Sequence, residues 1–168
     1  DAPLSRPQPV FRLTHQTFNA LLDEFADAGT LENRLSAVER ENMKTYGYGA
    51  KGFTLSMLQT ALEVSDGKVS TAIIKELLQA GREMMTHPIE PLPGVEEALK
   101  QLSDRFRLVV VTKGDLFHQE SKLAASGLGS YFSGVEIVSE KTAEIYTRAF
   151  ARHGGAAETS IMTGNSVK

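Results

Sequence analysis

The sequence RLVVVTKGD at residues 107–115 decides the fold that we predict for this chain. Its centre, 108–111, is an apolar and mostly β-branched run with little alternation, which is typical of a strand covered on both faces, as in a parallel sheet. In open α/β sheets, ligands bind at the carboxyl ends of the strands, where loops and helix N-termini present backbone amides. The polar segment that follows the run, 112–115, is therefore a candidate ligand site.

Strand and helix patterns alternate on both sides of this segment. We predict strands over 107–112, 134–138 and 160–163, and helices over 95–103, 116–126 and 142–153. Alternating strands and helices are typical of a doubly wound α/β fold with a parallel sheet. Residues 91–168 are therefore predicted to form an α/β core.

The preceding part of the chain, 11–90, shows helical periodicity and no strand pattern. Apolar residues at helical spacing predict four helices, over 11–28, 31–46, 52–64 and 68–85. Gly29 is a plausible stop for the first helix, and Thr30 is a plausible N-cap for the second. Four helices with short polar links predict a small bundle. Residues 1–10, which hold three of the six prolines, are predicted to be a disordered or extended tail.

Composition limits the class of protein. The chain has 168 residues, of which 41% are apolar and 23% charged, a mixture that supports a buried core. It contains no cysteine, which excludes a disulfide scaffold, a cysteine zinc site and a cysteine nucleophile. The net charge of -3 gives no reason to expect nucleic acid or a membrane as a partner, and no segment approaches the ~20 apolar residues of a membrane helix. We expect a soluble, cytoplasmic protein whose oligomeric state the sequence leaves open.

Three polar features follow predicted strands. The hydroxyl of Thr112 and the backbone amides of 113–115 can hold a phosphate oxygen or another anion ahead of a helix. Lys141 precedes a predicted helix, and since that end of a helix favours anions, an anionic ligand or nearby carboxylates would offset its charge. Asn165, in the segment Gly-Asn-Ser, can ligate a hard cation through oxygen. Taken singly, such features are more often ordinary turns or a solvated lysine, so only their order and spacing make them informative.

In that order, the three features resemble the motifs of the haloacid dehalogenase-like (HAD) hydrolase superfamily. The run that ends at Thr112 resembles the second motif, Lys141 the third, and 162–166 the fourth, which more often reads Gly-Asp-Ser. Leu-Pro-Gly-Val at 92–95 resembles the segment that leads from the cap of these enzymes back into their core. The resemblance implies a Rossmann-like three-layer core with a parallel sheet, and an inserted four-helix cap, with the boundaries given above.

For function, the resemblance implies a Mg²⁺-dependent phosphatase that hydrolyses a small phosphorylated metabolite through an aspartyl-phosphate intermediate. Thr112 would donate a hydrogen bond to a phosphoryl oxygen, helped by the backbone amides of Lys113 and Gly114. Lys141 would neutralise the phosphoryl group and hold the charge of the nucleophile. Asn165 would lie in the metal shell, directly or through water, and the cap would close over the site and read the leaving group.

The chain departs from the family at the first motif, Asp-x-Asp, whose first Asp is the nucleophile and whose second protonates the leaving group in the phosphatases. No such pair occurs: Asp1 heads the tail, and Asp23 and Asp27 fall within a predicted helix. Neither the nucleophile nor the acid/base Asp can therefore be assigned to a residue. The carboxylate that follows the fourth motif in the family would lie beyond Lys168.

The absent motif also has a structural consequence. In this family its strand lies between the strand that ends at Thr112 and the one that ends at Thr163, so its absence would leave a gap in the sheet. Unpaired buried backbone groups cost about 1–3 kcal/mol each, which is a large loss against a typical total stability of about 5–15 kcal/mol. We therefore expect that residues of the molecule are missing from this sequence between Val10 and Phe11 and after Lys168.

Other interpretations stay open. A 2-haloacid dehalogenase of the same family uses an Asp nucleophile without a metal, although 113–115 and the segment Gly-Asn-Ser favour phosphoryl transfer. If the Asp-x-Asp pair is truly absent, the chain is a non-catalytic protein that binds phosphate or a partner. A third possibility is an unrelated α/β domain with incidental polar residues at its strand ends. The substrate is not predicted, since the following residues could line the site or belong to the core or surface of the cap: Tyr46, Tyr48, Lys51 and Phe53.

Overall fold

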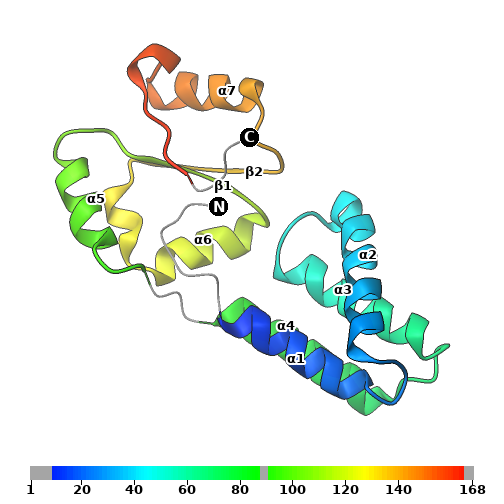
Figure 1. Ribbon diagram of the computed structural model, residues 1–168. Coiled ribbons are helices and arrows are strands. Elements are labelled where there is room, and N and C mark those ends of the chain that lie inside the picture. Colours follow the sequence, from blue (N-terminus) through cyan, green and yellow to red (C-terminus); the bar gives the residue numbers. More distant parts are fainter. Residues whose placement is uncertain (1–8, 88–90, 165–168) are drawn as a thin grey trace. The chain divides into compact units, whose positions relative to one another are not determined.

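The computed structural model describes residues 9–87 and 91–164. These residues divide into two compact units, one that ends at His87 and one that begins at Pro91 (Figure 1). The first unit is built from helices, and the second contains both helices and strands, so the predicted α/β class is confirmed in its coarse form. Within these two ranges, none of the helices combines the length and the apolar character that crossing a membrane requires.

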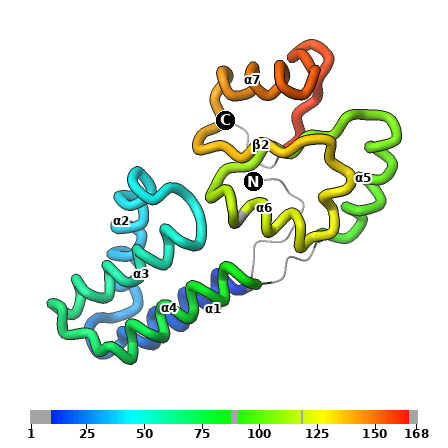
Figure 2. The backbone as a smooth tube through the Cα atoms, turned by 180° about the vertical axis from the view of Figure 1, so that it is seen from behind, coloured from blue at the N-terminus to red at the C-terminus, as the bar shows by residue number. Residues whose placement is uncertain are grey.

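The helical unit contains the four predicted helices: α1 (Pro9–Leu22), α2 (Ala28–Tyr46), α3 (Ala50–Val64) and α4 (Thr71–Thr86). In Figures 1 and 2, α1 lies alongside α4 and α2 lies alongside α3. The apolar stripe predicted on the second helix is confirmed, because Leu31, Leu35 and Val38 are all fully buried. Each large apolar side chain that is buried in this way stabilises the fold by about 1.5–3 kcal/mol. Other helices contribute further large and fully buried side chains to the core: Phe18, Leu22, Met57 and Leu77.

Helix α1 begins two residues earlier than the sequence predicts and runs through Val10 and Phe11 without a break. The assignment of Pro9 and Val10 to a tail is therefore wrong. Proline suits the first position of a helix, because its φ is already helical and its missing N–H would have no partner there. Val10 is buried, and its carbonyl accepts a hydrogen bond from the Thr14 hydroxyl at 2.8 Å.

The N-cap of α2 is Asp27, and the prediction that Thr30 caps this helix and Gly29 stops the preceding one is wrong. The Asp27 carboxylate accepts hydrogen bonds from the Thr30 hydroxyl at 2.6 Å and from the Thr30 backbone N–H at 3.0 Å. These bonds, the hydroxyl first, hold the pKa of Asp27 below its usual range. Thr30 therefore lies inside the first turn of α2 and donates to the capping residue instead of being one. Helix α1 ends earlier than predicted, at Leu22.

The α/β unit contains the following elements in chain order: α5 (Val95–Ser103), β1 (Val109–Lys113), α6 (Leu116–Ala125), the 3-10 helix η1 (Leu128–Tyr131), β2 (Gly134–Val138), α7 (Ala143–His153) and the 3-10 helix η2 (Ala157–Thr159). The two strands are parallel and pair in register, from Val109 opposite Gly134 to Lys113 opposite Val138. Figures 1 and 2 both show α7 on one face of this strand pair and α6 on the other.

The strand predicted over 160–163 does not form, and the sheet has two strands in the described residues. Ile161 and Met162 are 87% and 64% exposed. A strand needs a neighbour to pair with, and the strand that the resemblance puts between this segment and β1 is not among the residues described. The predicted Rossmann-like three-layer core is therefore not seen in the described residues, which show a two-stranded parallel sheet with helices.

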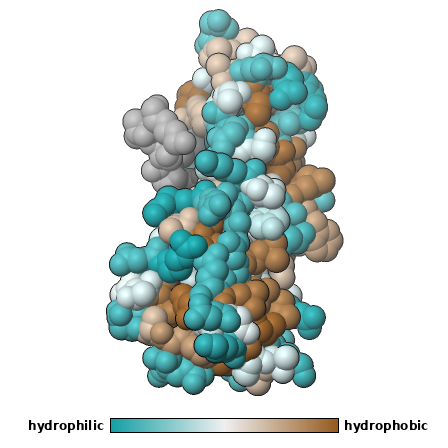
Figure 3. Space-filling model, turned by 90° about the vertical axis from the view of Figure 1, so that its right-hand side faces the viewer, coloured by the Kyte–Doolittle hydropathy of each residue, from teal (hydrophilic) through white to brown (hydrophobic). Residues whose placement is uncertain are grey.

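The absence of a further strand beside β1 in the described residues also accounts for the exposure of β1. The sequence predicts a strand covered on both faces, but every residue of β1 is half-buried rather than buried. Large apolar side chains also remain exposed elsewhere, and the space-filling view shows apolar areas, in brown, among polar ones on the face that it presents (Figure 3). The apolar run of β1 is thus a strand as predicted, with fewer neighbours than its composition is suited to.

Candidate functional site

The carboxyl ends of β1 and β2 meet at one edge of the sheet. Thr112 pairs with Ile137 and Lys113 with Val138, so the segments that follow the two strands begin level with each other. The first of these segments contains Gly114, and the second, 139–142, contains Lys141. Thr112, at the end of β1, and Lys141, in the segment that follows β2, thus belong to strand ends at the same edge of the sheet, as expected for parallel strands.

The donors assigned to phosphate from the sequence make only weak hydrogen bonds. The Thr112 hydroxyl donates to the side-chain oxygen of Gln119, on α6, at 3.4 Å, which is long for an O–H···O bond. The Gly114 backbone N–H donates to the carbonyl of Val138, also at 3.4 Å. A charged phosphate oxygen is a stronger acceptor than either partner, so it can replace both.

Gly114 is required at its position for two reasons. Its φ of +140° is one that L side chains rarely adopt, and a Cβ there would lie 2.8 Å from Nε2 of Gln119. We expect Gly114→Ala to lower the free energy of unfolding by about 1–3 kcal/mol, the usual cost of a strained backbone position. Thermal unfolding measures this change. Gly129→Ala is the control, since its Cβ meets nothing nearer than Leu123 Cγ at 3.9 Å, and equal losses in the two variants would contradict the prediction.

An ion pair connects the two segments at this edge. The Lys113 ammonium lies 2.9 Å from a carboxylate oxygen of Glu140, the residue that precedes Lys141. The side chain of Lys113 is 16% exposed and that of Glu140 is 57% exposed. Sequence reasoning assigned no role to Glu140, because nothing in the sequence indicates which lysine its carboxylate would meet.

Lys141 is half-buried and directly precedes Thr142, the N-cap of α7. The Thr142 hydroxyl accepts a hydrogen bond from the Ile145 backbone N–H at 3.4 Å, and Glu144 lies in the first turn of the helix. Within 9–87 and 91–164, Lys141 is in no ion pair.

The predicted metal ligand, Asn165, lies outside the described residues. Inside them, no group of three or more His, Asp or Glu side chains is placed to hold a metal ion. Of the carboxylates that follow β1 and β2, Glu140 is paired with Lys113. Hard cations such as Mg²⁺ require several oxygen ligands. The part of the chain that the structure describes does not by itself fit a magnesium ion.

A second charged cluster, missed in the sequence, fastens α7 to β2. Glu136 of β2 is 12% exposed, and one of its carboxylate oxygens lies 2.7 Å from Nε2 of His153. Arg152 donates to both carboxylate oxygens at 3.0 Å, and Arg107 donates to the His153 carbonyl. The ring of His153 stands over Gly134, where a Cβ would overlap it. The one sequence signal was a glutamate in the middle of an apolar strand, which needs charged partners if it is buried.

The structure assigns one of the four undecided residues of the helical unit to its core. Phe53 is 3% exposed, and its ring centre lies 4.7 Å from that of Phe11. Tyr46 and Tyr48 are 52% and 46% exposed, and Lys51 is also exposed. Phe53 therefore contributes to packing, whereas the other three residues lie at the surface.

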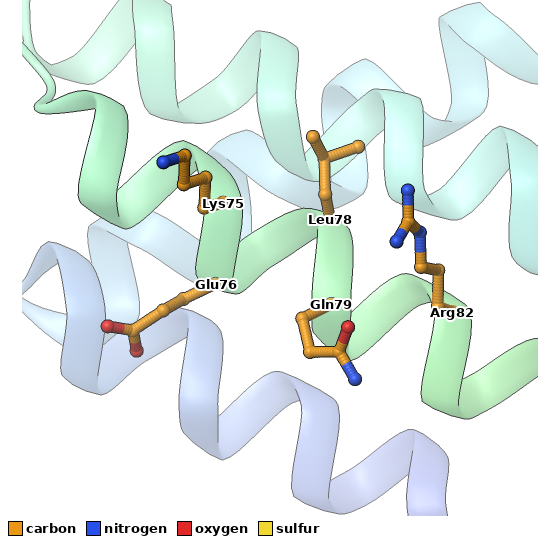
Figure 4. A pocket seen from close by; sticks show the side chains of 5 residues that line it. All are labelled: Lys75, Glu76, Leu78, Gln79 and Arg82. Carbon is orange, nitrogen blue, oxygen red and sulfur yellow. The ribbon is translucent and has the colours of Figure 1, made fainter.

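A surface hollow of about 390 Å³ lies along α4. Its lining residues are Lys75, Glu76, Leu78, Gln79 and Arg82. All five project from the same helix, and Figure 4 shows that their side chains do not converge on one point. A ligand site needs a few polar groups that converge in a concave, largely apolar space. This hollow shares no residue with the strand ends and does not have that arrangement.

The chain is similar to known proteins in sequence and in fold. Residues 8–168 match the family model of haloacid dehalogenase-like hydrolases. The solved structure of a haloacid dehalogenase-like family hydrolase from Xanthomonas campestris is 39% identical in sequence and has a TM-score of 0.89, covering 97% of this chain and 69% of that one. No curated protein matches the sequence.

Two further solved structures are similar in fold. One is a dehalogenase with an intermediate complex, at 18% identity and a TM-score of 0.50, covering 91% of this chain and 68% of that one. The other is the putative HAD-hydrolase YfnB from Bacillus subtilis bound to magnesium, at 13% identity and a TM-score of 0.52, covering 90% of this chain and 70% of that one. At these identities the likeness concerns the fold alone.

Proposed function

The chain belongs to the haloacid dehalogenase-like hydrolase family, and from this we propose that it is a magnesium-dependent phosphatase that acts on a small phosphorylated metabolite. One observation carries the proposal. Thr112, with a weakly bonded hydroxyl, lies at the carboxyl end of β1, and Lys141, in no described ion pair, belongs to the segment that follows the adjacent strand β2. A hydrogen-bond donor and a cation carried by neighbouring strand ends are groups that can complement the charge of a phosphoryl group.

The residues have distinct roles in this proposal. The Thr112 hydroxyl and the backbone amides of Lys113 and Gly114 bind phosphoryl oxygens, and the Gly114 amide exchanges its long bond to Val138 for one of them. Lys141 balances the negative charge of the phosphoryl group and of the attacking carboxylate. Asn165 would be a ligand of the magnesium ion, an assignment that rests on the family and not on a ligand set among the described residues.

The reaction itself needs a carboxylate nucleophile. In an aspartyl-phosphate mechanism, the carboxylate oxygen forms a bond to phosphorus as the bond to the leaving oxygen breaks and that oxygen takes a proton; water then cleaves the acyl phosphate. No residue of this sequence matches the Asp-x-Asp motif that supplies these groups in the family. The proposed activity therefore requires a carboxylate nucleophile that cannot be assigned to a residue of this sequence.

Release of phosphate from p-nitrophenyl phosphate tests the proposal. The full-length protein is assayed with magnesium and again with EDTA, and release of halide from 2-chloropropionate is measured in parallel. We expect phosphate release that requires magnesium, and no halide. Halide release without a metal would instead identify a dehalogenase, which is the second candidate within the family. Binding of inorganic phosphate without either reaction would identify a non-catalytic binding protein.

A further inference from the structure

The ion pair between Lys113 and Glu140 joins the two segments that carry the proposed phosphate-binding groups. Lys113 follows Thr112 directly and is the last residue of β1, and Glu140 directly precedes Lys141. The 2.9 Å contact between their charged groups therefore bridges the strand ends one residue away from each of the two groups that meet the phosphoryl oxygens.

The exposure of the two partners indicates which one holds the other. The Lys113 side chain is 16% exposed, whereas that of Glu140 is 57% exposed. A lysine that is largely removed from water needs a partner for its charge, and it lies in a strand with a fixed register. The carboxylate belongs to a segment between a strand and a helix, which has more freedom. Lys113 is thus the anchor, and Glu140 is the group that it holds.

The segment 139–142 lies between two fixed points. Val138 ends the β2 ladder opposite Lys113, and Thr142, which follows Lys141, caps α7. Between these points, the Glu140 carboxylate forms an ion pair with Lys113 of β1. Because Lys113 is largely removed from water, loss of this pair also lowers stability, so a positioning role is judged from local exchange in 139–142 and from kcat rather than from overall stability.

We propose that Glu140 is a positioning residue that acts through Lys113: their ion pair holds 139–142 against the end of β1 and keeps the Lys141 ammonium beside Thr112. The catalytic consequence rests on the proposed function, whereas the tether between the two segments does not. The Lys113 side chain then serves as an anchor for Glu140, and its contribution to phosphate binding comes from its backbone N–H.

A double-mutant cycle in the full-length protein tests this proposal. Glu140→Gln removes the charge with little change of shape, and Lys113→Met removes the ammonium but keeps an apolar stem. Hydrogen exchange of the backbone amides in 139–142 reports the tether, and kcat and KM for p-nitrophenyl phosphate report its consequence. Glu63→Gln, which breaks the Arg34–Glu63 ion pair of the helical unit, is the control.

We expect each single variant to exchange the amides of 139–142 about fivefold faster and to lose about fivefold in kcat with KM within about twofold, an effect typical of a lost contact between neighbouring charges. The double variant should lose no more than either single one, because both remove the same contact. Glu63→Gln should match the wild type in both measurements.

Three results decide the matter. Unchanged exchange in Glu140→Gln would overturn the proposal. A further loss of kcat when Glu140→Gln is added to Lys113→Met would also overturn it, since Glu140 would then act directly on Lys141. If the wild type hydrolyses no phosphate ester while exchange responds as expected, the tether stands and the proposed function fails.

Discussion

Replacement of Lys141 by alanine is expected to lower kcat for p-nitrophenyl phosphate at least about a hundredfold, the usual effect of removing a preorganised charge from a reacting group. Lys141 belongs to the segment that follows β2, and no described residue forms an ion pair with it. Its removal leaves the negative charge of the phosphoryl group and of the nucleophile without the compensation that the proposal assigns to it. Initial rates at saturating substrate and magnesium measure the change.

Two variants make this prediction specific. Lys141→Arg keeps the positive charge at a different geometry, and we expect it to recover part of the loss. Lys100→Ala removes an exposed lysine of α5 in the same unit and should retain full activity. Activity of Lys141→Ala within about threefold of the wild type would contradict the assigned role, because a preorganised charge is worth far more than that.

The second large effect concerns stability. Glu136→Ala should lower the free energy of unfolding by about 2–3 kcal/mol, since hydrogen bonds to a charged group contribute about 1.5–3 kcal/mol and the partners are left unsatisfied. The residue is 12% exposed and bonds both His153 and Arg152 of α7. For a chain of this size, each kcal/mol corresponds to a shift of about 2–4 °C in Tm. Differential scanning calorimetry measures the shift.

The matched control for this variant is a surface ion pair in the helical unit. Arg34 and Glu63 have side chains that are 46% and 33% exposed, and pairs of this kind contribute about 0.2–1 kcal/mol. Glu63→Gln should therefore cost well under half as much as Glu136→Ala. Equal losses would mean that Glu136 does not hold α7 to β2. Glu136→Gln, which keeps an acceptor for Arg152, should fall between the two.

Elements with strong local signals were predicted well. The helix over 95–103 and the strand over 134–138 have the observed bounds, because an apolar period and a nearby glycine mark each of them. The four helices of the first unit were also found from periodicity. Their ends were less accurate, since Asp27 and Thr30 are both good caps and only the folded backbone decides which one accepts the hydrogen bonds.

Elements that depend on distant partners were predicted poorly. The apolar pattern of 160–163 indicates a strand, but a strand forms only when another strand offers its backbone groups. The contact between Glu136 and His153 joins residues 17 apart in sequence, across the turn into α7. No local pattern specifies such a pair. It follows from the antiparallel return of the helix over the strand.

The candidate site likewise contains residues that a local pattern indicates and residues that depend on distant partners. Thr112 and Lys141 were located from their places after predicted strands, and parallel pairing brings such places together in any sheet of this kind. The roles of Gln119 and Glu140 could not be predicted, because they depend on which side chain of a neighbouring element each one reaches. The order of motifs thus indicates candidate site residues, whereas the side chains that position them are identified only from the folded structure.

The edge of β1 that no described strand pairs with has a practical consequence for handling this chain. No described strand pairs with the outer edge of β1, whose centre is three consecutive valines. An apolar edge strand, here with one charged residue, Lys113, at its end, is a template for the strand of another molecule, and natural proteins shield such edges for that reason. In a solution of this polypeptide by itself, the rate of intermolecular strand addition rises with protein concentration, whereas the rate of unfolding does not. Protein concentration is therefore the first variable to control, before temperature.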